Sequence, residues 1–220
     1  MSSAHPSIFL TGGTGYMGSR LAPMLIARGH DVCALTRQQS VAKLPPGCQP
    51  IIGDAIAGGY EEQVPGECSF VHLVGVAHPS PAKAAEFRSI DLPALRTSVA
   101  AAQKVHARHF VFVSVAHPAP AMKAYIAARQ ECEQIIEASG LNATILRPWY
   151  VLGPGHRWPY ALLPVYWLME RIPATRESAL RLGLVTLPQM LNALLAAIET
   201  PCQGTRIMDV QAIRRQNPPK

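Results

Sequence analysis

The stretch Thr11-Gly12-Gly13-Thr14-Gly15-Tyr16-Met17-Gly18 joins the apolar run of residues 8–10 to a predicted helix over residues 17–28. Its glycines at positions 12, 15 and 18 give a GxxGxxG spacing. In a strand–turn–helix unit, the first glycine permits the sharp turn, the second lets backbone amides approach a pyrophosphate, and the third lets helix and strand pack closely. The N-terminus of the following helix, with its unpaired N–H groups and positive dipole end, attracts the negatively charged pyrophosphate as well. Residues 11–18 are therefore predicted to bind a dinucleotide, with a purely structural turn as the alternative.

Short apolar runs alternate with helical segments along the rest of the chain. The sequence predicts strands at residues 32–35, 49–52, 70–74, 109–113, 143–146 and 206–210, and helices at 82–106 (with a break near Pro93), 121–139 and 187–199. The strand segments are nearly continuous in valine, isoleucine, leucine and phenylalanine, which is typical of a parallel sheet covered on both faces. Alternation of strands and helices implies right-handed βαβ units. We therefore predict an α/β fold, a doubly wound and mostly parallel Rossmann sheet in the order 3-2-1-4-5-6, with a small C-terminal cap.

Length and composition fit one globular domain. The chain has 220 residues, of which 49% are hydrophobic and 15% are charged, and this balance suits a covered sheet and argues against disorder. We expect a single Rossmann domain over residues 1–220, in which residues from about 148 to 220 form the cap over the strand ends.

Charge and residue types narrow the class of ligand and the compartment. The net charge of +6 comes from scattered lysines and arginines, which favours an anionic small molecule over a nucleic acid. The five cysteines form no CxxC pair and the histidines form no HExxH pair, so we predict no metal site. The N-terminus lacks a secretory pattern, and the apolar stretch 161–169 is too short to span a membrane. We expect a cytoplasmic protein without a transmembrane segment.

The ends of the following strands predict which dinucleotide binds. Thr36-Arg37 ends the second strand, where an acidic residue would bind a ribose 2′-hydroxyl, and the Arg37 guanidinium suits a 2′-phosphate. We therefore favour NADP over NAD, with a solvent-exposed loop arginine as the alternative. Asp54 follows the third strand and either accepts a hydrogen bond from the adenine amino group or caps the next turn. Leu73-Val74-Gly75 ends the fourth strand, where the cofactor ribose is expected to lie against the backbone.

Together these segments resemble the short-chain dehydrogenase/reductase superfamily, in its extended and atypical branches with the epimerases and dehydratases. The resemblance rests on TGGTGYMG at residues 11–18, Gly53-Asp54 after strand three, Leu146-Arg147-Pro148 and Leu152-Gly153-Pro154-Gly155 after strand six, and VTLPQMLNALLAAI at residues 185–198. It covers almost the whole chain and is closest to NmrA-like proteins and the related Rossmann-fold accessory subunit of respiratory complex I. It implies an NAD(P)-binding fold with the substrate at the C-terminal edge of the strands.

The resemblance also implies catalytic residues. The superfamily uses a Tyr-x-x-x-Lys pair on one helix face, in which the tyrosine exchanges a proton and the lysine holds the nicotinamide ribose and favours the tyrosinate. Tyr125 and Arg129 occupy the matching positions, so that an arginine replaces the lysine with the same charge and different contacts. Ser114 follows strand five, one position before the catalytic hydroxyl of the extended pattern, and is expected to polarise the substrate oxygen. The alternative for Tyr125 is a ring that packs in the cleft.

Two function hypotheses follow. In the first, the chain is an NAD(P)-dependent oxidoreductase, or an epimerase/dehydratase relative, that reduces a small carbonyl with NADPH. In the second, it is a non-catalytic NADP(H)-binding redox sensor, or an accessory or assembly protein, that acts through a protein partner. The aromatic segment 149–169 is a lid over an apolar substrate, a partner-binding patch, or core; it contains Trp149, Tyr150, Trp158, Tyr160, Tyr166 and Trp167. A homodimer through the alanine-rich segment 82–106 is left open.

Overall fold

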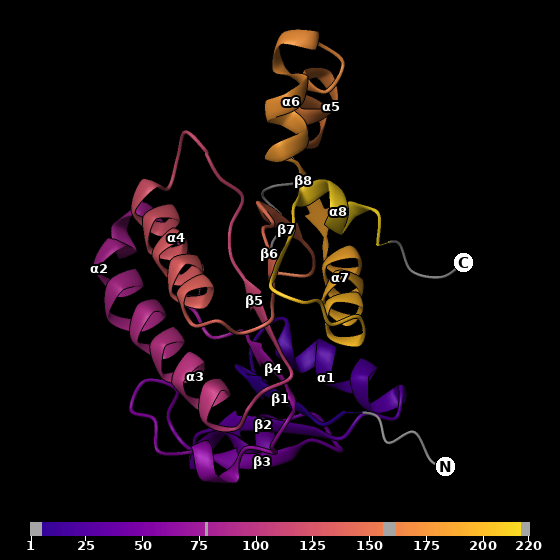
Figure 1. Ribbon diagram of the computed structural model, residues 1–220. Helices are drawn as coiled ribbons and strands as arrows, with labels where there is room; N and C mark the ends of the chain where they lie inside the picture. The colour runs from indigo at the N-terminus through magenta and orange to yellow at the C-terminus, as the bar shows by residue number, and fades with distance from the viewer. Residues whose placement is uncertain (1–5, 78, 156–161, 217–220) are drawn as a thin grey trace.

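A seven-stranded parallel sheet forms the centre of the computed structural model, which describes residues 6–77, 79–155 and 162–216 (Figure 1). The strands lie in the order β3-β2-β1-β4-β5-β6-β9, and every neighbouring pair is parallel. Their bounds are β1 Ile8–Thr11, β2 Val32–Thr36, β3 Gln49–Ile52, β4 Ser69–His72, β5 His109–Val113, β6 Ala143–Leu146 and β9 Thr205–Met208. The predicted fold class and strand order are confirmed, and β9 extends the sheet beyond β6. Because the order reverses between β1 and β4, a ligand crevice is expected at their carboxyl ends.

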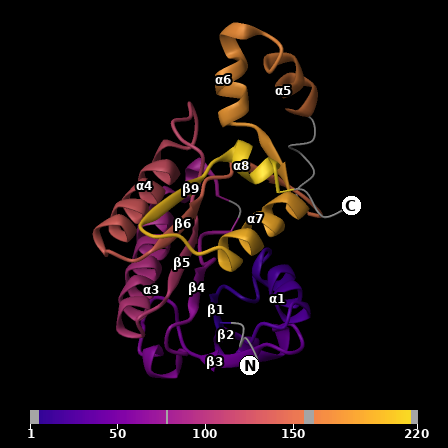
Figure 2. The ribbon, with the colours of Figure 1, turned by 45° about the vertical axis from the view of Figure 1, so that its right-hand side comes forward.

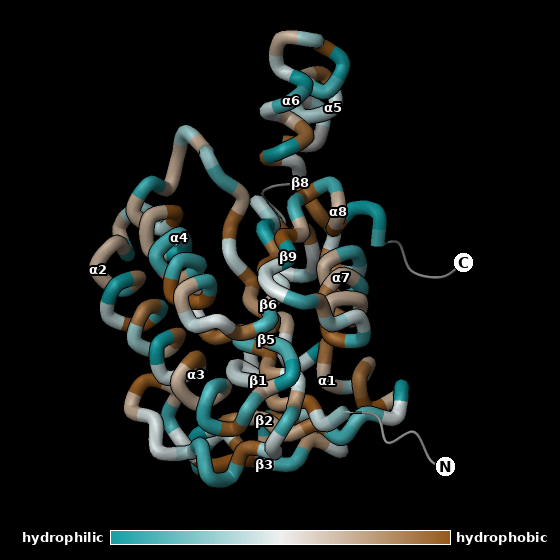
Figure 3. Tube along the Cα trace, viewed as in Figure 1, coloured by the Kyte–Doolittle hydropathy of each residue, from teal (hydrophilic) through white to brown (hydrophobic). Residues whose placement is uncertain are grey.

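Helices cover both faces of this sheet. Figure 1 shows α3 (Leu92–Lys104) and α4 (Lys123–Ala138) on one face, and α1 (Gly18–Ala27) and α7 (Leu187–Glu199) on the other. Successive residues of β1 point to opposite faces, so Ile8 and Leu10 join the aliphatic core under α1 and α7, whereas Phe9 joins the aromatic core under α3 and α4. The helices mix hydrophilic and hydrophobic residues along their length (Figure 3), as expected for helices with one buried face.

The helical stretch before α3 contains the feature that later shapes the site. A 3-10 turn (Pro81–Lys83), the single turn α2 (Ala84–Glu86) and a π-helical turn (Phe87–Asp91) lead directly into α3. The break predicted near Pro93 is therefore a change of helix type, and Pro93 lies in the first turn of α3, directly after the π-helical turn. The π-helical turn buries both Phe87 and Asp91.

Strands β7 (Tyr150–Leu152) and β8 (Leu184–Thr186) and the two helices between them build a second, smaller unit beside the main sheet. The two strands pair in parallel, and the helices α5 (Leu163–Met169) and α6 (Pro173–Arg181) lie between them in the chain. Figures 1 and 2 show α5 and α6 standing beyond the strand ends, away from the main sheet. The last predicted strand stops at Met208, because the Asp209 side chain accepts a hydrogen bond from the Ala212 amide and starts α8 (Val210–Arg214).

Two short 3-10 helices, Gln38–Lys43 and Glu61–Gln63, complete the connections on the β2–β3 side. No helix in the described ranges is long and apolar enough to cross a lipid bilayer.

Two histidines are buried within the sheet. His109 of β5 is 0% exposed, and its Nε2 lies 3.1 Å from Thr144 Oγ1. Burial, together with Arg206 and Arg108, lowers the pKa of His109 to about 4. His72 of β4 is 1% exposed, with its Nδ1 lying 2.9 Å from Ser98 Oγ and 3.2 Å from Thr11 Oγ1. Burial and the nearby Arg129 charge lower the pKa of His72 to about 3. Both rings are therefore neutral near pH 7.

We predict that acid destabilises the fold in part through His109. An unfolded histidine takes up a proton below about pH 6.5, whereas folded His109 resists until about pH 4, so the free energy of unfolding falls as the pH drops through this window. His109→Gln should remove up to about 1.4 kcal/mol per pH unit of that slope. Urea denaturation at several pH values measures it. The exposed His106→Asn is the control, and an equal slope in both variants would show that His109 does not contribute.

Candidate cofactor and active site

The candidate site is a cavity of about 480 Å³ at the carboxyl ends of β1, β4 and β5. Its wall is built from the turn after β1, the loops after β4, β5 and β6, and the start of α4. The cavity lies where the strand order reverses, which is where ligands bind in open α/β sheets. The wall includes the predicted cofactor residues Gly12, Gly15, Tyr16, Met17, Gly18, Leu73, Val74 and Gly75. Five others, Thr11, Gly13, Thr14, Arg37 and Asp54, lie outside its described wall.

Two glycines of the glycine-rich turn, Gly12 and Gly18, have no room for a side chain. Gly12 has a φ of +75°, and a Cβ there would stand 2.9 Å from the carbonyl carbon of Leu73. A Cβ on Gly18 would collide with the carbonyl oxygen of Gly12. Helix α1 starts at Gly18 with neither a side-chain cap nor an acidic residue in its first turn among the described residues. This cradle fits the diphosphate of a dinucleotide, because backbone amides approach closely and the positive helix end is left for an anion.

The region for the adenosine half is more open. Arg37 is exposed and directly precedes the 3-10 helix Gln38–Lys43. Oδ1 of Asp54 accepts hydrogen bonds from the amides of Ile56 (2.8 Å) and Ala57 (3.1 Å), so Asp54 caps its own turn, which is one of the two predicted roles. These two hydrogen bonds, with a smaller effect of Arg37, lower the pKa of Asp54. A contact between Asp54 and adenine stays a prediction.

Tyr125, Arg129 and Ser114 all line the same cavity. Tyr125 and Arg129 lie one turn apart on α4, with the guanidinium carbon 5.2 Å from the centre of the Tyr125 ring. Ser114 follows β5 and is 3% exposed, and its Oγ has no hydrogen-bond partner among the described residues. A buried hydroxyl without a partner in a cavity wall suits a donor to a ligand oxygen.

Arg129 is held from several sides. It is 6% exposed, its Nη2 lies 3.2 Å from Oδ2 of Asp91, and its Nη1 donates to the carbonyl oxygen of Val113 (3.3 Å). Although burial opposes the charge, Tyr125 and Asp91 raise the pKa of Arg129. A Cβ on Gly75 would collide with this guanidinium, so glycine is required there for a reason the sequence did not reveal.

Sequence reasoning missed Asp91. Asp91-Leu92-Pro93 has the pattern of a helix N-cap, with an aspartate followed by an early proline. In the structure Asp91 has helical backbone angles and no side-chain capping bond among the described residues. Its carboxylate instead accepts a hydrogen bond from the Val76 amide (2.8 Å) and pairs with Arg129.

The predicted aromatic lid divides into two parts. Trp149 and Tyr150 line the cavity, with ring centres 5.3 Å apart. Trp167 is instead 60% exposed on α5, under the Arg171 guanidinium, and Leu168 beside it is also exposed. Trp158 and Tyr160 lie outside the described residues.

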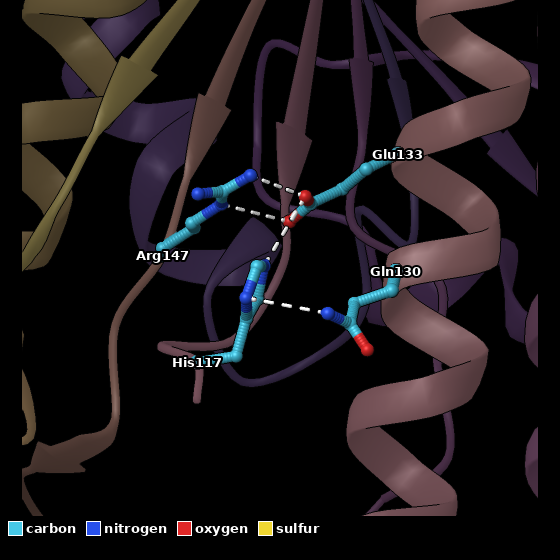
Figure 4. A network of polar contacts seen from close by, with 4 residues as sticks. All are labelled: His117, Gln130, Glu133 and Arg147. Carbon is cyan, nitrogen blue, oxygen red and sulfur yellow. Dashed lines mark hydrogen bonds and ion pairs between the residues drawn. The ribbon is translucent and has the colours of Figure 1, made fainter. Parts of the chain in front are cut away.

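A buried carboxylate joins two loops of the cavity wall to α4. Glu133 is 4% exposed and accepts hydrogen bonds from Nε (3.1 Å) and Nη2 (2.5 Å) of Arg147, which ends β6 (Figure 4). Nε2 of His117, from the loop after β5, lies 3.4 Å from the same carboxylate, and Gln130 contacts the other ring nitrogen. The loops after β5 and β6 are also joined directly by a hydrogen bond from the Ala116 amide to the Pro148 carbonyl oxygen (2.8 Å). This network, absent from the sequence predictions, fixes Ser114 and Trp149 relative to Tyr125.

No group of three or more metal-ligating side chains suited to hold a metal ion occurs within the part of the chain that the structure describes.

Comparison with known proteins gives both a family and a relative. The profile of a family described as NAD(P)H-binding matches residues 12–157. A protein of Stigmatella aurantiaca named 4-hydroxy-2-methyl-3-oxo-4-farnesyl-3,4-dihydroquinoline-1-oxide ketoreductase is 27% identical over 167 residues, which cover 66% of this chain and 50% of that protein. The chain therefore spans about half the length of this curated relative.

Solved structures share the fold. WbmH of Bordetella bronchiseptica, in complex with NAD+, has a TM-score of 0.68 at 19% identity, covering 93% of this chain and 75% of that one. UDP-glucose 4-epimerase of Thermus thermophilus, in complex with NAD, has a TM-score of 0.66 at 17% identity, covering 95% and 81%. The NAD(P)-binding fold that the resemblance to the short-chain dehydrogenase/reductase superfamily implies is confirmed by the family match and by these structures, whereas the NmrA-like branch stays a prediction.

We predict that Glu133→Ala lowers the free energy of unfolding by about 2 kcal/mol, because it leaves the Arg147 guanidinium and His117 without their shared acceptor. Thermal or urea unfolding monitored by circular dichroism measures the change. Glu131→Ala is the matched control on the same helix, since its ion pair with Arg96 is exposed and should contribute less than about 1 kcal/mol. Equal losses in the two variants would show that the Glu133 network does not brace the site.

Proposed function

Because the chain belongs to the NAD(P)H-binding family, we propose that it is an NADPH-dependent oxidoreductase that reduces a carbonyl group. The observation that carries the proposal is the meeting of Tyr125, Arg129 and Ser114 in the wall of the cavity that also contains the glycine-rich turn. The distant relationship to a ketoreductase supports the same reaction class. A single domain of residues 1–220 with its cap over the strand ends, as the sequence predicts, is part of this proposal.

In the proposed reaction, NADPH held at the glycine-rich turn would supply the hydride that the carbonyl carbon accepts as its π bond to oxygen breaks. Tyr125 donates its hydroxyl proton to the carbonyl oxygen, which becomes the alcohol. Ser114 donates a hydrogen bond to that oxygen while negative charge develops on it. Arg129, with its guanidinium carbon 5.2 Å from the Tyr125 ring centre, stabilises the phenolate that remains until solvent returns a proton.

The cavity wall suits an apolar substrate. Val115, Trp149, Tyr150 and Val151 line it together with Met17 of the glycine-rich turn. The name of the related ketoreductase describes a ring that carries an oxo group and a farnesyl chain. We therefore propose a ring ketone with an apolar substituent as the substrate class, and a small carbonyl compound as the simpler alternative.

For the cofactor, NADPH is proposed over NADH. The exposed Arg37 stands where the end of β2 approaches the adenosine ribose in this fold, and Thr36 rather than a carboxylate precedes it. The neighbouring Asp54 carboxylate offsets part of this charge, so NAD remains the alternative.

One surface favours a second candidate, a sensor or accessory protein that binds NADP(H) and acts through a partner. Trp167 is 60% exposed, Leu168 54% and Ile172 42%, and all lie on or beside α5. Exposed apolar residues gathered on a projecting element are typical of an interaction surface. This surface also leaves homodimer formation open.

We predict that Tyr125→Phe lowers turnover of ring ketones at least about 100-fold, because the proton donor is lost, while NADPH affinity stays within about twofold of the wild type. Stopped-flow loss of NADPH absorbance measures turnover, and quenching of protein fluorescence measures binding. The control is Tyr60→Phe, a tyrosine outside the described cavity wall, which should leave both unchanged. Tight NADPH binding with no turnover by the wild-type protein on any ketone would instead favour the sensor.

We predict that Arg37→Ala weakens NADPH binding about 10- to 100-fold and leaves NADH binding unchanged, because only NADPH carries the 2′-phosphate that a guanidinium binds. Isothermal titration with each cofactor measures the two affinities. Lys43→Ala, an exposed cation at the end of the same 3-10 helix, controls for general electrostatic attraction. Equal weakening of both cofactors would contradict the assignment of Arg37 to the 2′-phosphate.

A further inference from the structure

We propose that Asp91 is a positioning residue that holds the Arg129 guanidinium beside Tyr125 and offsets part of its charge, so that the ion pair and not a lone cation acts on the Tyr125 hydroxyl. This inference rests on the proposed function and adds a positioning residue to it.

The geometry ties Asp91 to both halves of the site. The Asp91 side chain is 0% exposed, and its Oδ2 lies 3.2 Å from Nη2 of Arg129. Its Oδ1 accepts a hydrogen bond from the Val76 amide (2.8 Å), in the loop after β4 that borders the cavity. Glycine at position 75 leaves the space that the guanidinium fills. The π-helical turn, the loop after β4 and α4 therefore meet at one carboxylate.

The charge balance explains why this matters. A lone guanidinium close to a phenol in a buried site favours loss of the phenol proton. With a carboxylate 3.2 Å away, the pair carries no net charge, and its field at the phenol is the difference between two opposing contributions. Asp91 therefore sets how strongly the charge of Arg129 acts on the Tyr125 hydroxyl.

Other groups facing this cluster do not supply the opposing charge. From β4, the buried His72 is neutral, since its pKa is lowered to about 3 by burial and by Arg129. From α4, Cys132 stays a thiol, because burial raises its pKa to about 12. From β5, Phe112 and the Val113 carbonyl are uncharged, and Phe87 packs its ring 5.0 Å from that of Tyr125. Glu133 of α4 is paired with Arg147. Among the described residues, Asp91 is thus the carboxyl group paired with Arg129; burial raises its pKa, and Arg129 and the Val76 amide act against that rise.

The test is Asp91→Asn, which can keep the bond from the Val76 amide and removes the negative charge that faces Arg129. The ionisation of Tyr125 is followed by the near-ultraviolet absorbance of its phenolate in the purified protein, with Tyr125→Phe spectra subtracted to assign the signal. We expect the midpoint of that transition to fall by about one pH unit or more, because Arg129 then acts alone. An unchanged midpoint in a folded Asp91→Asn protein overturns the proposal.

A second variant covers the case in which Asp91→Asn does not fold. The double change Asp91→Asn with Arg129→Gln replaces the ion pair by two neutral amides, so its midpoint should match the wild type. A midpoint clearly above the wild-type value would show that Arg129 acts on Tyr125 without compensation, and would overturn the proposal. The titration needs no turnover. Shifted midpoints in a protein inactive on every ketone would therefore uphold the charge assignment and refute the proposed function.

Discussion

No side chain fits between the turn after β1 and the loop after β4. The backbones of Gly12 and Leu73 approach so closely that a single added carbon would stand 2.9 Å from the Leu73 carbonyl carbon. This contact brings the start of α1 and the end of β4 to the same edge of the sheet, where the strand order reverses. The cradle for an anion follows from this contact, because only glycine lets the backbone of the turn come so close to the backbone of Leu73. The cavity lies at the same edge of the sheet.

Another glycine without room for a side chain lies on the side of the cavity that contains Tyr125 and Arg129. Gly75 gives up its side-chain space to the guanidinium of Arg129, and the loop that contains it is bonded through Val76 to Asp91. The arginine at position 129, where the resemblance predicts a lysine, therefore depends on its neighbours as well as on its own charge. It comes with a carboxylate on the neighbouring helical segment and a glycine on the facing loop, and these three residues form one unit of shape and charge.

The sequence was sufficient to predict the main sheet and the glycine-rich wall of the cavity. The motif Gly12-x-x-Gly15-x-x-Gly18 and the runs of apolar residues in the strands are local signals that can be recognised without knowing the tertiary structure. The sequence was insufficient where the signal is short or ambiguous. Strands β7 and β8 have three residues each, too few to show an alternating pattern. Asp91 has the appearance of a helix cap, and Glu133 is one of several acidic residues on α4. Trp149 and Trp167 share an aromatic stretch, and only tertiary packing distinguishes the partly buried Trp149 ring in the cavity wall from the exposed Trp167 ring.

The pairing of β7 with β8 has a consequence for how such a protein diverges. Both ends of the α5–α6 insertion are anchored by this strand pair, and β7 contributes Tyr150 and Val151 to the cavity. Sequence changes within the insertion can therefore alter its exposed apolar residues while α4, braced by Glu133, keeps its position. Under the proposed function, evolution can thus vary the surface of the insertion without rebuilding the helix that contains Tyr125 and Arg129.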